Sequence, residues 1–218
     1  MRKALREAVK DLRHLLNRNY NRESTLKFVG DKHQLSREER LTLYRGVYDA
    51  QSVKRHQSKL IPTTAISGKT LAVDGYNILI TVESLLSDKP LVLCDDGFIR
   101  DISAVHGKHK PTKKTVNALT IILNFLNKNK ARKTLFFYDA QVSKSGELAA
   151  LTRSLIKKSG LDGDAQAVKQ ADLATLKSSN IVASSDAVII EKAKRVVDLA
   201  GEIAKIIAPN QLLKLTEI

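Results

Sequence analysis

The sequence offers few residues that could cross-link the chain. Its 218 residues include one cysteine, Cys94, and no tryptophan. A single cysteine forms no disulfide within the chain, and it excludes the paired Cys and His spacings of a structural zinc site. Aromatic residues are only 5% of the chain although hydrophobic residues are 43%, so we expect a core built from aliphatic side chains.

Long hydrophobic runs are also missing. No stretch approaches the roughly 20 apolar residues of a membrane span. Residues 1–7 are too charged to contain the apolar run of a signal peptide. We therefore expect a cytoplasmic protein whose partners do not include a membrane.

Acidic residues are outnumbered by basic ones. The chain has 37 Lys and Arg against 23 Asp and Glu, which gives a net charge of +14. Residues 1–70 alone hold 16 basic and 7 acidic residues. Such an excess attracts polyanions and speeds their association, and nucleic acid is the most common polyanionic partner.

The N-terminal part has the pattern of a small helical domain. Apolar residues at helical spacing predict helices over residues 4–16, 23–29 and 37–60. Gly30 is expected to end the second helix. Ser36 and Glu39 form a capping box at the start of the third. A small polar run at 63–68 is typical of a linker, so we assign residues 1–66 to a basic α-helical domain.

After residue 68, short apolar strands alternate with helices. Strands are predicted at 70–74, 134–139, 165–168 and 181–183, with helices at 112–129, 147–158 and 187–208. Residues 90–102 form a hairpin signal around Asp95-Asp96-Gly97. The alternation favours a parallel sheet covered by helices on both faces. The expected fold class is therefore α/β, with an α/β domain over residues 67–218.

Three of the predicted strands lead directly to an aspartate, at Asp74, Asp139 and Asp186. The carboxyl ends of parallel strands meet at one edge of a sheet, where ligands bind. Carboxylates that converge there repel one another and favour a cation, and oxygen ligands suit Mg²⁺ or Mn²⁺. Such an ion can activate water near a phosphate, which indicates phosphodiester hydrolysis. Each aspartate alone could instead be an ordinary turn or capping residue.

The same segments carry a family resemblance. Residues 71–79, LAVDGYNIL, resemble the first strand of PIN-like and NYN nucleases, in which Asp-Gly-x-Asn begins an acidic site. Residues 137–139 and 182–186 resemble two later strand ends of those nucleases. Over nearly its whole length the chain is similar to a mainly archaeal family. In that family a basic helical domain, domain of unknown function 434, precedes a PIN-like domain.

This resemblance implies roles for individual residues. Asp74, Asp139 and Asp186 would be ligands of Mg²⁺ or Mn²⁺, and Asn77 would orient a water or the scissile phosphate. Asp172 takes roughly the place of another acidic residue, although a solvated or capping role is equally open. The helix at 112–129 contains no acidic residue, which departs from the usual pattern. Either the metal site has fewer ligands than usual, or another acid such as Asp95, Asp96 or Asp101 substitutes. Glu83 is a candidate for supporting the site without binding the ion, and a surface role is its alternative.

Basic side chains are the expected nucleic-acid contacts. The helical part contributes Arg37, Arg40, Arg45, Lys54, Arg55 and Lys59. A loop beside the proposed site contributes Arg100, Lys108, Lys110 and Lys113, and the start of a helix contributes Lys144. An ordinary solvated surface is the alternative for each.

These observations lead to two functional hypotheses. The first is a metal-dependent nuclease whose helical domain grips the substrate, expected to be RNA because PIN-like domains mostly cut RNA. The second is a non-catalytic RNA- or ribosome-binding protein with a degenerate PIN-like domain. Three or more carboxylates within reach of one ion would favour the first. A homodimer or a ribonucleoprotein association is left open.

Overall fold

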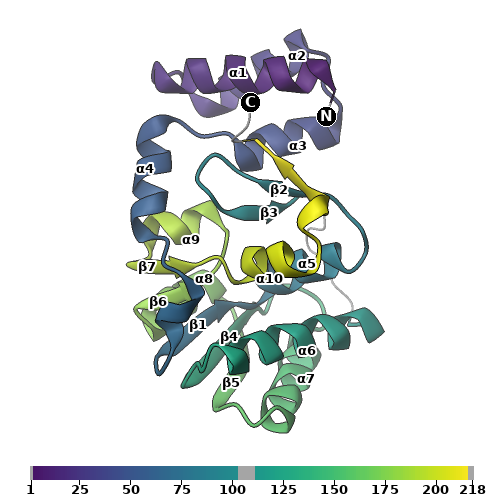
Figure 1. The fold of residues 1–218 in the computed structure, drawn as a ribbon, viewed down its shortest axis with the longest axis vertical. Helices are drawn as coiled ribbons and strands as arrows, with labels where there is room; N and C mark the ends of the chain where they lie inside the picture. The colour runs from purple at the N-terminus through teal and green to yellow at the C-terminus, as the bar shows by residue number, and fades with distance from the viewer. Residues whose placement is uncertain (1, 103–110, 216–218) are drawn as a thin grey trace.

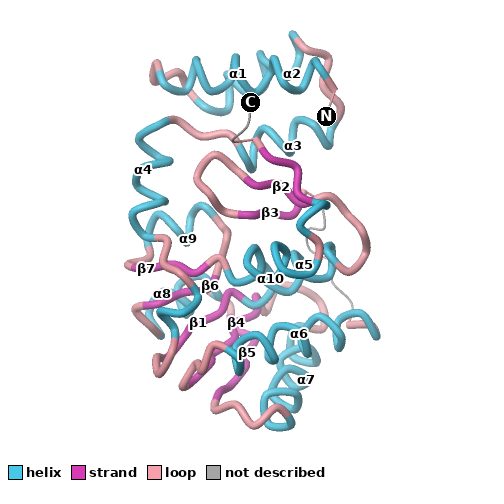
Figure 2. The backbone as a smooth tube through the Cα atoms, viewed as in Figure 1, coloured by secondary structure: helices cyan, strands magenta, loops and turns pink. Residues whose placement is uncertain are grey.

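The computed structural model describes residues 2–102 and 111–215. A helical region, a small three-stranded sheet and a larger five-stranded sheet follow one another from top to bottom in Figure 1. Figure 2 shows how the helices lie around the larger sheet. Within the described residues, no helix combines the length and the apolar character that a membrane span requires.

The N-terminal region is entirely helical, as the sequence predicts. Its helices are α1 (Lys3–Asn17), α2 (Arg22–Lys32), α3 (Arg37–Gly46) and α4 (Ala50–Lys59). The capping box is confirmed at the start of α3. The Ser36 hydroxyl accepts a hydrogen bond from the Glu39 amide at 3.3 Å, and the Glu39 carboxylate accepts one from the Ser36 amide at 2.9 Å.

Two details of this region differ from the prediction. Gly30 does not end α2, which continues to Lys32. A side chain at Gly30 would come within 2.4 Å of the Arg40 guanidinium, so this glycine provides room for packing. The expected helix over 37–60 is two helices, because Asp49 starts a new one by accepting a hydrogen bond from the Ser52 amide at 2.8 Å.

The larger sheet is parallel throughout. Its strands are β1 (Thr70–Asp74), β4 (Lys133–Asp139), β5 (Gly163–Val168), β6 (Ile181–Ala183) and β7 (Arg195–Val197), in the order β5-β4-β1-β6-β7. The flanking helices are α5 (Gly75–Leu85), α6 (Lys113–Lys128), α7 (Ser145–Lys158), α8 (Ala171–Ser178), α9 (Ala187–Lys192) and α10 (Leu199–Ile207). The predicted fold class, a helix-flanked parallel sheet after an all-helical region, is confirmed.

Alternate strand residues face two different layers of helices. Ala183 of β6 and Val197 of β7 pack into the large core with α5, α6, α7 and α10. Val182 and Val196, one position earlier in each strand, pack against α9. Because both faces are covered, these strands are apolar on both sides and carry no alternating pattern in the sequence.

The single long helix expected over 187–208 is wrong. The segment contains α9, the edge strand β7 and α10. Val196 and Val197 are β-branched and pair with β6, and this pairing prevails over a continuous helix. Asp198 then caps α10, since its carboxylate accepts a hydrogen bond from the Gly201 amide at 3.0 Å.

The predicted hairpin is confirmed and belongs to the small sheet. Strands β2 (Leu91–Leu93) and β3 (Ile99–Asp101) are antiparallel, and β8 (Leu212–Lys214) adds to β2 in parallel after the 3-10 turn η2 (Pro209–Gln211). Gly97 has a φ of +85°, which suits a tight turn. Asp198 holds the hairpin to the larger sheet by accepting a hydrogen bond from the Ile99 amide at 2.7 Å.

The helical region shares its core with the small sheet. Leu12 and Leu43 from the helices pack with Val92, Cys94 and other residues from the β2 and β8 side in one buried cluster. The expected linker instead contains the 3-10 turn η1 (Thr63–Ile66), whose Ile66 is buried in the main core. The division at residue 66 stays a prediction, and the two parts contact each other extensively.

Candidate active site at the carboxyl edge of the sheet

The central strand β1 places Asp74 at the carboxyl edge of the larger sheet. Helix α5 begins at the next residue, Gly75. A side chain at Gly75 would lie 2.4 Å from the Tyr138 ring and 2.7 Å from the Phe137 carbonyl oxygen. Glycine is therefore needed for the chain to turn into α5 so close to β4, and this turn fixes the position of Asp74.

Burial and neighbouring carboxylates both act on Asp74. Burial, together with the charges of Asp186 and Asp172, raises the pKa of its carboxyl to about 7, against hydrogen bonds from Ser184 and the Asn77 amide that lower it. The Ser184 hydroxyl donates to the Asp74 carboxylate at 2.8 Å. The pKa of the Asp74 carboxyl therefore lies close to neutral pH. An added cation would relieve the repulsion between Asp74 and the neighbouring carboxylates.

Asn77 connects α5 to the loop that follows β6. Its side-chain carbonyl oxygen accepts hydrogen bonds from the Ser185 amide at 2.8 Å and the Ser185 hydroxyl at 3.1 Å. The oxygen is thus used to hold Ser185 in place. The expected role for Asn77 in orienting a water or phosphate stays a prediction.

Asp186 stands on the neighbouring strand connection and caps α9. One carboxylate oxygen accepts hydrogen bonds from the Val188 and Ile189 amides at 2.8 and 3.2 Å. Within the described residues its other oxygen accepts none. The Asp186 amide donates to the Ser184 hydroxyl at 3.0 Å, and the same hydroxyl donates to Asp74. Ser184 therefore sets the positions of both acids.

Asp139 and Asp172 complete the acidic edge. Asp139 ends β4, and its carboxylate accepts a hydrogen bond from the Gln141 amide at 2.8 Å. Asp172 lies in the first turn of α8. Burial raises the pKa of the Asp172 carboxyl, and the charges of Asp186 and Asp139 raise it further. The four strand-end aspartates, Asp74, Asp139, Asp172 and Asp186, thus form a connected chain of mutually repelling charges.

The metal centre expected from the sequence stays a prediction. Within residues 2–102 and 111–215, no three His, Cys, Asp or Glu side chains are placed to hold one ion. Mg²⁺ is often bound by only one or two carboxylates, with waters and substrate phosphates completing its shell. Asp74 and Asp186 fit that chemistry: they stand on adjacent strands, repel one another, and form no ion pair within the described residues.

The other acids considered as substitutes are held elsewhere. Asp95 forms an ion pair with Arg13 at 2.7 Å, and Asp101 lies 3.5 Å from Arg45. Glu83 accepts a hydrogen bond from the Thr115 hydroxyl at 2.6 Å. Asp96 is fully buried and contacts both Arg100 and His56 at 2.7 Å. Asp101 lines the same cleft as Asp186, but within the described residues none of these four carboxylates completes a group of three metal-binding side chains.

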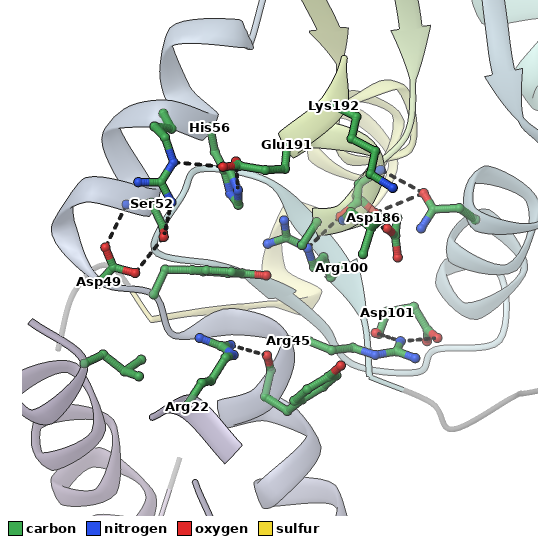
Figure 3. Close-up of a pocket in the computed structure, with 18 of the residues that line it drawn as sticks. Arg22, Arg45, Asp49, Ser52, His56, Arg100, Asp101, Asp186, Glu191 and Lys192 are labelled. Carbon is green, nitrogen blue, oxygen red and sulfur yellow. Dashed lines mark hydrogen bonds and ion pairs between the residues drawn. The ribbon is translucent and has the colours of Figure 1, made fainter. Parts of the chain in front are cut away.

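A cleft of about 1020 Å³ opens between the helical region and the acidic edge. Figure 3 shows side chains from both sides projecting into it, including Arg22 and Arg45 from the helical region, Asp186 from the start of α9 and Lys192 from its end. Asn77 also lines it. The candidate catalytic residues Asn77 and Asp186 therefore share one space with basic and aromatic side chains of the helical region.

The structure distributes the expected nucleic-acid contacts unevenly. Arg45, Arg55 and Arg100 line the cleft, but Arg100 is buried and its guanidinium donates to Asp96 and the Ser185 carbonyl oxygen. Burial and pairing disfavour a phosphate-clamping role for it. Three of the remaining basic residues have a partner: Arg40 binds Asp31, Lys59 binds the Ile190 carbonyl, and Lys144 binds Glu147. Arg37, Lys54 and Lys113 are exposed. Lys108 and Lys110 lie outside the described residues.

Sequence reasoning did not find several residues that line the cleft. Arg22 and Lys192 are basic and Tyr20 and Tyr44 are aromatic, and all four face it. Only the scarcity of aromatic residues could have drawn attention to the tyrosines. Arg22 and Lys192 belong to helices far apart in the chain, and no local spacing links them.

Comparisons with known proteins identify families whose printed descriptions name no activity. A family model described as "Domain of unknown function (DUF5616)" matches residues 63–202, and one described as "Protein of unknown function (DUF434)" matches residues 4–59. "Uncharacterized protein MJ0935" of Methanocaldococcus jannaschii is 38% identical over 201 residues, covering 91% of this chain and 96% of the relative. No solved structure matches significantly. The resemblance to domain of unknown function 434 is confirmed, and the PIN-like resemblance stays a prediction.

Proposed function

The chain belongs to the DUF5616 family, and we propose that it is a divalent-cation-dependent nuclease that cuts RNA held in its cleft. One observation carries the proposal. At the carboxyl edge of the sheet, Asp74 is coupled to Asp186 and Asp172 and is paired with no described cation, and Asp186 lines a cleft together with basic side chains. The resemblance of residues 71–79 to PIN-like nucleases supports the same chemistry.

Asp74 and Asp186 would hold the ion, Mg²⁺ or Mn²⁺. When bound, such an ion neutralises charge that develops on a phosphate and lowers the pKa of a coordinated water. The two carboxylates come from β1 and from the connection after β6, and their repulsion is the physical reason that a cation would bind there. Asp186 keeps one oxygen without a described hydrogen bond, which supports its role as a ligand.

Ser184, Ser185 and Asn77 would position this pair. The Ser184 hydroxyl contacts both Asp74 and the Asp186 amide, and Asn77 fixes the intervening residue Ser185. Groups that orient metal ligands typically contribute about 10- to 100-fold to metal affinity or activity. Replacing Ser184 with alanine should therefore lower activity within that range.

Asp172 and Asp139 would add negative charge at the carboxyl edge of the larger sheet. Both interact electrostatically, and Asp172 also acts on Asp74. Their carboxylates would accept protons from water near the ion or attract a second cation. The helical region would supply the opposite charge, through Arg22, Arg45 and Arg55 on the other wall of the cleft.

The test is cleavage of labelled RNA and DNA with Mg²⁺ or Mn²⁺, with and without chelator. We expect Asp74→Asn and Asp186→Asn each to lower the rate by at least about 100-fold, because loss of a ligand should exceed the effect of losing an orienting group. Asp162→Asn is the matched control, because Asp162 is exposed just before β5, at the opposite edge. Cleavage that persists in Asp74→Asn would mean a different site or a contaminant.

A second candidate function is RNA binding without catalysis. It is favoured by the finding that no three-ligand group forms among the described residues. Under this alternative, wild type would bind RNA but leave it intact with either ion at every pH tested. The nuclease proposal predicts chelator-sensitive cleavage that depends on Asp74.

A further inference from the structure

We infer that the cleft takes a single-stranded segment of nucleic acid, whose unpaired bases stack on Tyr20 and Tyr44. The inference rests on the proposed function, because it names the form of substrate presented to the acidic edge. It is carried by exposed aromatic rings, by an uncompensated arginine between aromatic side chains, and by the size of the cleft.

Tyr20 and Tyr44 are exposed, although the chain as a whole has few aromatic residues. Aromatic residues are 5% of the sequence, yet the side chains of Tyr20 and Tyr44 are 56% and 57% exposed, and both line the cleft. Tyr20 is presented by the turn after α1, where Asn19 has a φ of +62° and the Tyr20 amide donates to the Leu15 carbonyl at 3.2 Å. Tyr44 projects from α3. Their positions are therefore fixed by the backbone although their rings are open to solvent.

Arg22 supplies positive charge next to Tyr44 and Tyr48. Its guanidinium lies 4.8 Å from the centre of the Tyr48 ring and 5.8 Å from that of Tyr44. It donates hydrogen bonds to the Val47 carbonyl at 2.8 Å and to the Tyr44 carbonyl, and it forms no ion pair with any described carboxylate. Its charge is thus held in place and remains available to a phosphate.

Lys192 lies on the other wall of the cleft. It is exposed on α9 and near enough to Asp172 to oppose the rise in that carboxyl's pKa. Figure 3 shows Lys192 above Asp186, on the side of the cleft opposite Arg22. A strand that crosses from Arg22 to Lys192 would bring its backbone past Asp186.

This arrangement suits unpaired bases better than a duplex. Duplex RNA is recognised mainly through its shape, its phosphates and its 2′-hydroxyls, whereas single strands offer free base faces that stack on aromatic side chains. A volume of about 1020 Å³ is close to the upper end of the range for small-ligand sites. It accommodates a few nucleotides.

The experiment measures binding apart from cleavage. Fluorescence anisotropy in EDTA, on the full chain, would compare a labelled 12-nucleotide RNA with the same strand in a duplex. We expect Tyr20→Ala and Tyr44→Ala each to weaken single-strand binding by roughly tenfold, and Tyr44→Phe to retain it. Phe28→Ala should have no effect, because Phe28 is 62% exposed on α2 but does not line the cleft.

The outcomes separate this inference from the nuclease proposal. Equal affinity for duplex and single strand, or unchanged single-strand binding by both tyrosine variants, would overturn it even if the enzyme cuts RNA. Tyrosine-dependent single-strand binding without cleavage would support it while refuting the nuclease. Thermal melting of each variant checks folding, and Tyr20→Ala keeps the test valid if Tyr44→Ala unfolds.

Discussion

The aspartates of the hairpin and those of the sheet edge have opposite electrostatic surroundings. The hairpin aspartates, Asp95, Asp96 and Asp101, each lie within 3.5 Å of an arginine nitrogen. None of the strand-end aspartates forms an ion pair within the described residues; instead, the charge of Asp186 helps to raise the pKa of both Asp74 and Asp172. Paired buried charge connects the parts of the fold, whereas unpaired repelling charge lowers stability and is retained only where it serves binding or chemistry.

The largest expected effect on stability comes from breaking a hairpin pair. In Asp96→Asn, the buried Arg100 guanidinium keeps its charge but loses its carboxylate partner, and His56 loses the same contact. Removal of one partner from a buried ion pair typically costs about 3–5 kcal/mol. Asp186→Asn should be close to neutral, because asparagine also caps helices well. Denaturant unfolding measures both variants, and equal losses would contradict the distinction.

Gly75→Ala should have the next largest effect. The added methyl group meets the Tyr138 ring and the Phe137 carbonyl, so we expect a loss of about 1–3 kcal/mol in the free energy of unfolding. Cleavage should fall as well, since Asp74 is displaced with the turn. Gly146→Ala on α7 is the control, because its side chain would meet nothing within 4 Å. That change should be neutral or stabilising by up to about 1 kcal/mol.

The pH dependence of stability should identify Asp74 directly. The pKa of its carboxyl is about 7 in the folded protein, above the value of about 3.9 in an unfolded chain. The folded state therefore binds the proton more tightly, so in EDTA this carboxyl lowers stability progressively as pH rises from about 4 to 7. Asp74→Asn should lack this component, so its advantage over wild type should widen across that range. Parallel stability curves for the two proteins would show that folding does not raise the pKa of the Asp74 carboxyl.

The smallest expected effect concerns salt. Removing one phosphate contact from a single-stranded complex lowers the slope of log affinity against log salt by about 0.7. We expect this change for Lys192→Ala in the RNA-binding assay with EDTA. Lys128→Ala, at the end of α6 and outside the cleft, should leave the slope unchanged. Identical slopes for the two variants would remove Lys192 from the binding surface.

Local signals in the sequence were sufficient for much of the fold. The run from Leu71 to Asp74, the Ser36 capping box and the Asp-Gly turn at residues 96–97 each specify structure within a few residues. The strand β7 was missed because its three residues, Arg195–Val197, sit between helices and gain their pairing from β6 and from a bridge between Val196 and Leu60. Strand pairing is a tertiary contact, and local helix propensity gives no information about it.

The candidate site was predictable only in part. Asp74, Asp172 and Asp186 do interact, as expected for residues that follow parallel strands. Whether Arg100 faces solvent or Asp96 could not be deduced from spacing, because that depends on how the hairpin packs against α4 and the sheet. The tyrosine-lined wall depends on how helices distant in sequence meet the sheet edge.

Titration with Mn²⁺ by calorimetry tests the central claim most directly. Wild type at pH 8 with single-stranded RNA should bind the ion at a site whose affinity drops at least about tenfold in Asp74→Asn and in Asp186→Asn. Asp162→Asn should bind like wild type. If wild type binds no Mn²⁺, or if all four proteins bind it equally, the strand-end aspartates do not form a cation site.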